Sequence, residues 1–391
     1  MHDDIPFARP FIGGEEEEAV VRVLRSGWLT TGGEALAFEK EFAAFLSNYH
    51  ALKDDIHCLA VNSATSGLHL ALEACGVGPG DIALVPSCTF TATAEVARYL
   101  GADPVFVDVA PGTFHIDPAA LEQTLKRLPA GKAKAVIPVH YGGLPCDMAA
   151  IMDIARRYGL KVIEDAAHAF PSSVGTIGDA GVFSFYATKT ITTGEGGMIA
   201  CRDRAMADRI SVMRSHGIDR TVWSRYSDTR APWYYEVVEA GYKYNLPDLL
   251  AAIGRVQLSR ARELLRMREE IAAAYDAAFA ANACLLIPPT GPGDARHLYP
   301  LRLNPPQLSI GRDEFTSKLK EAGIGVSVHF IPLHTMPYYK NRYQLNESDL
   351  PETIKSCHNE ISLPIWPGMS AAQTNRVIEA VQTISRQYEH N

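Results

Sequence analysis

Short apolar runs alternate with amphipathic segments between residues 57 and 203. The runs are rich in Val, Ile or Phe and are bounded by Gly, Pro or polar residues, as buried strands are. The segments between them carry apolar residues at helical spacing, for example over residues 67–75 and 148–158. This alternation predicts an α/β fold in which a mostly parallel sheet has helices on both faces. The predicted strands are residues 57–63, 82–87, 103–109, 135–141, 160–166, 180–186 and 198–203.

Longer helical patterns and a mixed region replace this alternation after residue 245. We place a domain boundary between Asn245 and Gln257. Residues 1–250 are then expected to form an N-terminal segment and a large domain, and residues 251–391 a smaller C-terminal α+β domain. The elements expected in the smaller domain are one or two long helices over residues 249–279, a strand over 297–303, and helices over 312–322 and 371–387.

Composition narrows the class of function. The chain of 391 residues is 47% hydrophobic, carries a net charge of −8 and has no basic stripe, so nucleic acid and acidic membrane surfaces are poor partners. Its seven cysteines are scattered without a C-x-x-C pair, which favours reduced thiols, and no metal site is expected. The start lacks the pattern of a signal peptide, and no apolar segment approaches the roughly 20 residues that span a bilayer. These features predict a cytoplasmic protein.

The most informative stretch is FSFYATKTITTGEGG, residues 183–197, because it places Lys189 just after a predicted strand. A lysine that reaches from a strand end into a site can condense with a carbonyl if burial or nearby cations depress its pKa. An isolated lysine in such a loop is usually a surface residue. The interpretation therefore depends on the residues around it.

Two acids end the preceding strand in VIEDAAHAF, residues 162–170. The carboxyl ends of strands are where open α/β sheets bind ligands. In a pyridoxal enzyme an aspartate holds the pyridine nitrogen protonated, and we expect Asp165 in that role. His168, one helical turn further on, would cover the ring or bond its hydroxyl. The alternative is that Asp165 caps a helix and His168 is a core residue.

A candidate phosphate site follows the first predicted strand in VNSATSG, residues 61–67. Amides and hydroxyls at a helix start favour anions, so the candidates are Thr65, Ser66 and the amide of Ala64. Ser184 would add a further hydroxyl. Ser and Thr are also common N-caps, so the motif is weak when taken alone.

An aromatic residue follows the second predicted strand. Phe90, in PSCTFTAT, would stack on an aromatic cofactor at the carboxyl edge of the sheet. An aromatic side chain at such a position is more often part of the core.

Taken together, the motifs resemble those of the DegT/DnrJ/EryC1/StrS family of sugar aminotransferases, a branch of the fold-type I pyridoxal-phosphate enzymes. The resemblance runs in order along nearly the whole chain. It implies a seven-stranded, mostly parallel sheet in the large domain. The chain most resembles the branch of the family that aminates UDP-4-keto-sugars, which includes the UDP-4-amino-4-deoxy-arabinose aminotransferases. The matching segments are SGWLTTG, NSATSGLHLAL, GVGPGD, GADPVFVDV, PVHYGGLPCDM, VIEDAAHA, FSFYATKTITTGEGG, RSHG, GYKYNLPDLLAAIGRVQL, VHFIPLH and SLPIWPGM.

The resemblance also implies roles for individual residues. Lys189 would hold pyridoxal 5'-phosphate as an imine and move the proton between substrate and cofactor, which alternates with pyridoxamine 5'-phosphate. Asn245 would reach the phosphate of the partner subunit's cofactor, which implies a homodimer with composite sites. The remaining roles are the pyridine nitrogen for Asp165, the ring for His168 and Phe90, the phosphate for Thr65, Ser66 and Ser184, and the sugar for Trp28 and His329.

Two segments depart from the family pattern. Residues 170–181 lack the Lys-Gly pair common in relatives, so this loop is expected to be reshaped. Residues 220–235 are rich in Arg and aromatics, with Trp223, Arg225 and Trp233 among them. These three would contact a nucleotide or, equally, pack a dimer interface.

The favoured function is transamination of a nucleotide-linked keto-sugar, with glutamate as the amino donor. Keto-sugars linked to UDP and to dTDP are the substrates to test. One alternative is a pyridoxamine-phosphate-dependent sugar dehydratase on the same fold, in which a histidine replaces the lysine. The other is a non-catalytic regulator, expected to lack Lys189 or Asp165. Both residues are present.

Overall fold

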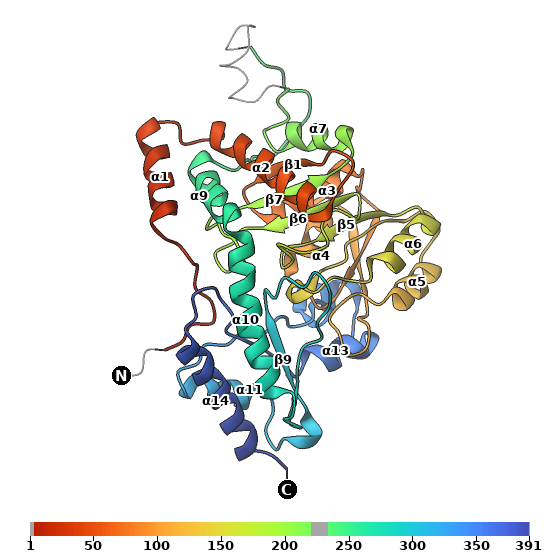
Figure 1. Ribbon diagram of the computed structural model, residues 1–391. Helices are drawn as coiled ribbons and strands as arrows, with labels where there is room; N and C mark the ends of the chain where they lie inside the picture. The colour runs from red at the N-terminus through yellow and green to blue at the C-terminus, as the bar shows by residue number, and fades with distance from the viewer. Residues whose placement is uncertain (1–3, 220–233, 391) are drawn as a thin grey trace.

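The computed structural model describes residues 4–219 and 234–390, in which two β-sheets are joined by a long helix (Figure 1). The central sheet of the described chain has seven strands in the order β1-β7-β6-β5-β4-β2-β3. Its pairs are parallel from β3 to β6, whereas β7 is antiparallel to both β6 and β1. The predicted mostly parallel α/β sheet is therefore confirmed. The strands are β1 His57–Val61, β2 Ile82–Pro86, β3 Asp103–Val107, β4 Ala133–Val136, β5 Lys161–Asp165, β6 Ala180–Ser184 and β7 Gly197–Cys201.

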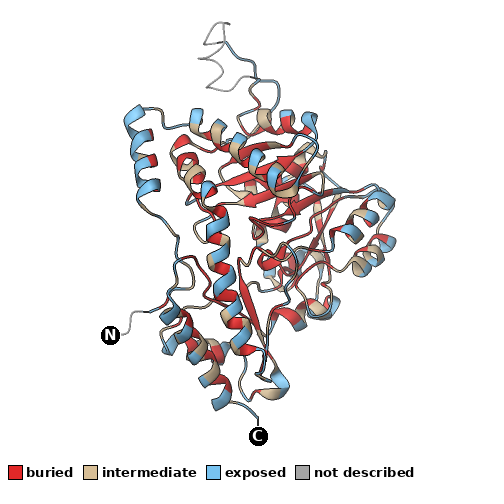
Figure 2. Cartoon of the chain, viewed as in Figure 1, coloured by how far each residue is buried: buried red, intermediate tan, exposed pale blue. Residues whose placement is uncertain are grey.

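Helices cover both faces of the central sheet, because neighbouring strand residues point to opposite sides. Phe183 packs in the core beneath α2, α5, α6 and α9, whereas Val182 packs in the core beneath α3, α4 and α7. Figure 2 shows the buried strands between these partly exposed helices. The helices of this region are α1 Gly14–Ser26, α2 Gly33–His50, α3 Ala64–Ala74, α4 Thr91–Tyr99, α5 Pro118–Arg127, η1 Tyr141–Gly143, α6 Met148–Tyr158, α7 Arg204–Met213 and α9 Asp248–Ser259.

The second sheet has the order β10-β9-β8 in the described chain, with antiparallel pairs, and it packs against α10, α11 and α14. The pattern over residues 249–279 resolves into two helices that break at Arg260. No helix of the described residues is long and apolar enough to cross a membrane. The elements are α10 Ala261–Phe279, β8 Leu285–Leu286, β9 Tyr299–Leu303, η2 Pro305–Gln307, α11 Arg312–Glu321, η3 Leu333–Thr335, α12 Pro337–Tyr343, η4 Glu347–Asp349, α13 Pro351–Cys357, β10 Glu360–Leu363 and α14 Ala371–Gln387.

The N-terminal segment joins this second unit. Ile5 forms a parallel bridge with Ile324 and belongs to the core of the second sheet. Its amide donates to the carbonyl of Gly323 (2.9 Å), and its carbonyl accepts from the amide of Gly325 (2.8 Å). The proposed domain division at residue 250 stays a prediction, but the beginning of the described chain is fastened to the C-terminal half.

Candidate active site

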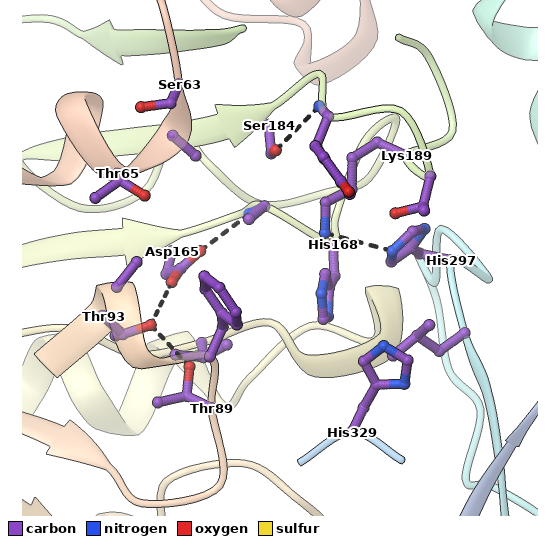
Figure 3. Close-up of a pocket in the computed structure, with 18 of the residues that line it drawn as sticks. Ser63, Thr65, Thr89, Thr93, Asp165, His168, Ser184, Lys189, His297 and His329 are labelled. Atoms are coloured by element: carbon purple, nitrogen blue, oxygen red, sulfur yellow. Dashed lines mark hydrogen bonds between the residues drawn. The ribbon is translucent and has the colours of Figure 1, made fainter. Parts of the chain in front are cut away.

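A cavity of about 470 Å³ lies at the carboxyl edge of the central sheet, where the second unit closes over it. Strands β1, β2, β5 and β6 all run in one direction, so their carboxyl ends meet at this edge. The residues that follow each of these strands line the cavity, together with residues next to β9 and β10 and near the N-terminus (Figure 3).

Lys189 projects into this cavity from the turn after β6. Its amide donates to the carbonyl of Tyr186 (2.9 Å), which fixes the turn. Its Nζ lies 3.5 Å from Nε2 of His297 (Figure 3). Burial of the amine lowers the pKa of Lys189 to about 7, with Asp165 opposing this shift and Arg268 adding to it. A large fraction of this amine is therefore neutral near pH 7 and able to act as a nucleophile.

Asp165 ends β5 and lies in the same cavity. The Thr93 hydroxyl donates to Oδ2 (2.8 Å), and the Ala167 amide donates to Oδ1 (3.1 Å). Thr89, in turn, contacts the Thr93 hydroxyl (2.7 Å). Burial raises the pKa of Asp165, while these hydrogen bonds and the charge of Lys189 act in the opposite direction. A cationic group bound against this carboxylate would favour its ionised form.

Glu164 points to the other face of the sheet, as strand alternation requires. Its carboxylate accepts hydrogen bonds from His140 Nε2 (3.1 Å) and from the amides of Gly175 (2.8 Å), Ile177 (2.7 Å) and Gly178 (2.7 Å). Burial alone would raise the pKa of Glu164, but His140 and the amides hold it below its usual value. This carboxylate therefore anchors the loop expected to be reshaped, and it does not line the cavity.

The N-terminus of α3 forms another wall. Ser63, Ala64 and Thr65 line the cavity, whereas the hydroxyl of buried Ser66 donates to the carbonyl of Ser63 (2.7 Å) in a capping box. Gly197 allows this close approach: a Cβ there would lie 2.8 Å from the Ala64 nitrogen and 2.9 Å from the Phe183 oxygen. The amides and hydroxyls at a helix start favour an anion at this wall.

Imidazoles line the side of the cavity near Lys189. The rings of His168 and His297 are 4.7 Å apart, and those of His168 and His329 are 6.4 Å apart. Burial is the main cause that lowers the pKa of all three imidazoles, and the charge of Lys189 is the next cause. The pKa of His329 falls to about 4. The rings are therefore neutral at pH 7. The described residues contain no group of three or more His, Cys, Asp or Glu side chains that could hold a metal ion.

A hydrogen bond from the main chain fixes the tautomer of one of these rings. The Gly142 amide donates to His168 Nδ1 (3.3 Å), so the proton of that ring is on Nε2. The Ser362 hydroxyl donates to Glu360 and contacts His329 Nδ1 (2.9 Å). Burial raises the pKa of Glu360 to about 8, so its protonated carboxyl can donate to Ser362 as well as accept from it, and both tautomers of His329 satisfy these contacts. The cavity thus receives one imidazole donor, from His168.

The remaining predicted residues are placed as follows. Ser184 lines the cavity, and so does Phe90, whose side chain is 58% exposed and lies 6.1 Å from the ring of Phe330. Asn245 and Trp28 lie elsewhere, where Asn245 Nδ2 donates to Thr31 Oγ1 (2.6 Å) and Trp28 Nε1 to the Thr31 carbonyl (3.3 Å). Trp223, Arg225 and Trp233 fall outside the described residues.

Thr93 and His297 are residues of the cavity that the sequence reasoning missed. Thr93 lies in the first turn of α4, and Thr89 comes just before this helix, four positions earlier, where its hydroxyl reaches that of Thr93. That signal was available in the sequence. His297 reaches Lys189 across 108 positions of the chain, and no spacing rule reveals such a contact.

Comparison with known proteins places this geometry in a family. The chain is 44% identical over 389 residues to the spore coat polysaccharide biosynthesis protein SpsC of Bacillus subtilis, with 97% of each chain covered. The structure of Spr1654 from Streptococcus pneumoniae, solved in a PMP form, is 31% identical and has a TM-score of 0.88 over 98% of this chain and 100% of that one. A PLP form of Spr1654 has a TM-score of 0.87, with 31% identity over 98% of this chain and 99% of that one.

A further solved structure is PseC of Helicobacter pylori, an aminotransferase involved in the biosynthesis of pseudoaminic acid. It is 27% identical, with a TM-score of 0.88 over 99% of this chain and 100% of that one. The model of the DegT/DnrJ/EryC1/StrS aminotransferase family matches residues 10–382. The protein therefore belongs to the DegT/DnrJ/EryC1/StrS aminotransferase family.

Proposed function

We propose that this protein is a pyridoxal-phosphate-dependent aminotransferase that transfers an amino group to a nucleotide-linked keto-sugar. The observation that carries the proposal is the arrangement of Lys189 and Asp165 in one cavity at the sheet edge. A neutral amine and a buried carboxylate from adjoining strands are the two groups that a pyridoxal ring requires. The existence of PLP and PMP forms of a structural relative supports the same pair of cofactor states.

The residues present fit pyridoxal phosphate. One wall offers the amides and hydroxyls of the α3 N-terminus with Ser184, which suit a phosphate. The opposite side offers the carboxylate of Asp165, fixed by Thr93 and Ala167, which suits a protonated pyridine nitrogen. Phe90 stands at the opening as a face on which a flat ring can pack. Ser66 is the least suited, because its hydroxyl is already used in the capping box.

Pyridoxal phosphate, when bound, supplies an electron sink that stabilises negative charge on the substrate carbon. Lys189 provides the attachment point for the cofactor aldehyde, because its amine is largely neutral at pH 7. When an amino donor takes its place, Nζ would take the proton from the α-carbon of the donor and deliver it to the aldehyde-derived carbon of the cofactor. His168 carries its proton on Nε2 and would donate it in a hydrogen bond to the ring hydroxyl.

The substrate is proposed to enter from the side of the second unit. There His329 presents a neutral imidazole beside Phe7 and Phe330, which suits a sugar hydroxyl. The polysaccharide and pseudoaminic acid pathways of relatives support a sugar substrate. We further propose a UDP-4-keto-sugar as acceptor and glutamate as donor, on the sequence resemblance alone.

We also propose a homodimer in which Asn245 completes the partner subunit's site, and a cytoplasmic location. All cysteines of the chain are free in the structure, which suits a reducing compartment.

Mixing Lys189→Ala and Asn245→Ala subunits tests the composite site. Reassociated dimers should regain about a quarter of the wild-type activity, since half are mixed and each mixed dimer has one intact site. Two independent sites would give no activity above that of the Asn245→Ala subunits alone.

The decisive experiment is absorbance of the purified protein with pyridoxal phosphate, before and after glutamate, followed by a panel of UDP- and dTDP-keto-sugars. An aminotransferase converts the aldehyde form of the cofactor to the amine form and then returns it with a keto-sugar, and mass and NMR analysis identify the amino-sugar. A deoxygenated sugar product would indicate the dehydratase instead. Absence of any spectral change with every donor and acceptor would leave only a non-catalytic protein.

A further inference from the structure

Arg268 is a fully buried arginine halfway along α10, with a side chain only 1% exposed. Its guanidinium donates to the carbonyls of Ile365 (2.6 Å), His297 (3.0 Å) and Thr188 (3.4 Å). Within the described residues, no carboxylate forms a hydrogen bond or ion pair with it, and Nε has no partner. A buried arginine is normally paired with an acid, so this arrangement requires a reason.

The carbonyls bound by Arg268 all belong to the surroundings of the candidate active-site lysine. Thr188 directly precedes Lys189, and His297 carries the imidazole that contacts Nζ at 3.5 Å. Ile365, the third, lines the same cavity. One planar guanidinium therefore fastens the turn after β6, the segment before β9 and the segment after β10 to one another. Its rigid fork suits this task, which a single ammonium group could not perform.

The same guanidinium acts on Lys189 through its charge. A positive charge in a dry interior disfavours protonation of a neighbouring amine, because the field is poorly screened there. Burial has already lowered the pKa of Arg268 to about 9, yet at pH 7 it remains charged. This gives a reason for the missing acidic partner, since a carboxylate next to Arg268 would cancel the field at Lys189.

We propose that Arg268 is a positioning residue for Lys189, holding the Lys189 and His297 segments together and supplying an unpaired positive charge that adds to burial in favouring the neutral amine. This role rests on the proposed function, because it prepares the amine for an aldehyde. Arg268 does not line the cavity and acts only through its neighbours. It is therefore distinct from the residues that contact cofactor or substrate.

The other charged and titratable groups that face Lys189 define the expected sign. Asp165 on β5 raises the pKa of Lys189, whereas Arg268 on α10 lowers it after burial, which has the largest effect. The rings of His168, His297 and His329 are neutral near pH 7, because burial lowers their pKa values. Without the charge of Arg268, the charge of Asp165 is no longer offset by a positive charge, so the pKa of Lys189 should rise.

The test compares wild type with Arg268→Met and Arg268→Lys, and uses Arg302→Met as a matched control. Arg302 is a half-buried arginine of β9 whose guanidinium lies 5.8 Å from the Phe114 ring and does not line the cavity. The cofactor-free proteins are acetylated with limiting acetic anhydride across a pH series, and modification of Lys189 is followed by peptide mass spectrometry. Only the neutral amine reacts, so the profile reports the pKa of Lys189 without cofactor or substrate.

For Arg268→Met we expect the profile to move to higher pH, and a tenfold rise in the proton affinity of the amine would lower its neutral fraction at pH 7 about fivefold, from about one half to about one eleventh. Arg268→Lys loses the planar fork, so its rate of pyridoxal phosphate capture should fall. Arg302→Met should match wild type in both measurements. The proposal is overturned if Arg268→Met titrates like wild type, or if Arg268→Lys captures the cofactor at the wild-type rate.

Arg268→Lys also decides the matter if Arg268→Met does not fold. The acetylation profile needs no cofactor, so its outcome is independent of whether the protein transfers amino groups. Failure of the wild-type protein to bind pyridoxal phosphate would contradict the proposed function, whereas an unchanged acetylation profile would contradict only the role of Arg268. Circular dichroism of each variant establishes that the fold is retained.

Discussion

The amine of Lys189 lies 3.5 Å from Nε2 of His297, although the two residues are 108 positions apart. Because this imidazole is neutral, it can accept a hydrogen bond from the amine and restrain the direction of the amine. We expect His297→Leu to lower kcat/KM about tenfold, the value of one hydrogen bond. His297→Gln keeps a polar group near Nζ and should retain more activity than His297→Leu. Equal activity of the two variants would show that the contact has no role.

Lys189→Ala removes the only group to which we assign cofactor attachment. The absorbance band of the attached aldehyde should disappear, and turnover should fall by more than about 10³-fold. Lys161→Ala is the control, because this lysine of β5 pairs with Asp179 at the surface (2.7 Å). A Lys189→Ala protein that still turned over substrate would refute the assignment.

Asp165→Asn keeps the shape of the side chain but removes the charge that holds a protonated ring nitrogen. We expect kcat to fall about 10²-fold or more, with a smaller change in cofactor affinity. Thr93→Val removes one donor to Asp165, so the pKa of this carboxyl should rise further and the acidic limb of the pH–rate profile should move to higher pH. Kinetics from pH 5 to pH 9 measure both effects.

Thr65→Val and Ser66→Ala separate anion binding from helix capping. Thr65 lines the cavity, so its loss should weaken cofactor affinity by about tenfold in equilibrium dialysis. Ser66 is engaged with Ser63, so Ser66→Ala should instead lower the free energy of unfolding by about 1 kcal/mol. If Ser66→Ala weakens affinity as much as Thr65→Val, then Ser66 also contacts the phosphate.

Glu164→Gln should destabilise the chain without changing the chemistry of the cavity. An amide in this position would turn donors toward Gly175, Ile177 or Gly178, at a cost of about 3 kcal/mol. The wild-type pKa of Glu164 lies below its ordinary value of 4.5, so its stabilising contribution is present above pH 4.5 and is lost as the pH falls through the lowered value. Urea unfolding should therefore show a difference between wild type and variant that shrinks on acidification.

The sheet was predictable because its strands are buried on both faces and read as continuous apolar runs. The apolar runs predict strands that extend too far where the chain turns toward the cavity. Strand β4, for example, ends at Val136, and Pro138 beyond it has no amide that could bond to a neighbouring strand. Lys189, Asp165 and His168 were predictable for a related reason. Asp165 ends β5, and His168 and Lys189 follow β5 and β6 within a few residues, so local sequence determines that all three reach the carboxyl edge.

The contribution of the second unit was not predictable in the same way. His297 and Arg268 reach the lysine only after α10 and β9 have packed against the central sheet, a long-range arrangement that leaves no local pattern. Arg268 in particular lies in a helix with many charged residues, where its sequence neighbours Arg266 and Glu269 give no sign that it is buried. Trp28 and Asn245, in contrast, followed from family resemblance and lie outside the described cavity.

The pairing of Ile5 beside Ile324 affects how the protein should be produced. Phe7 and Ala8, just beyond this bridge, form part of the cavity wall, and the Trp366 indole holds the Pro6 carbonyl (3.0 Å). A purification tag placed close to this end, or a shortened gene product that begins after it, would disturb the entrance for substrate. Recombinant versions should therefore carry their tag after α14 or cleave it away before any assay.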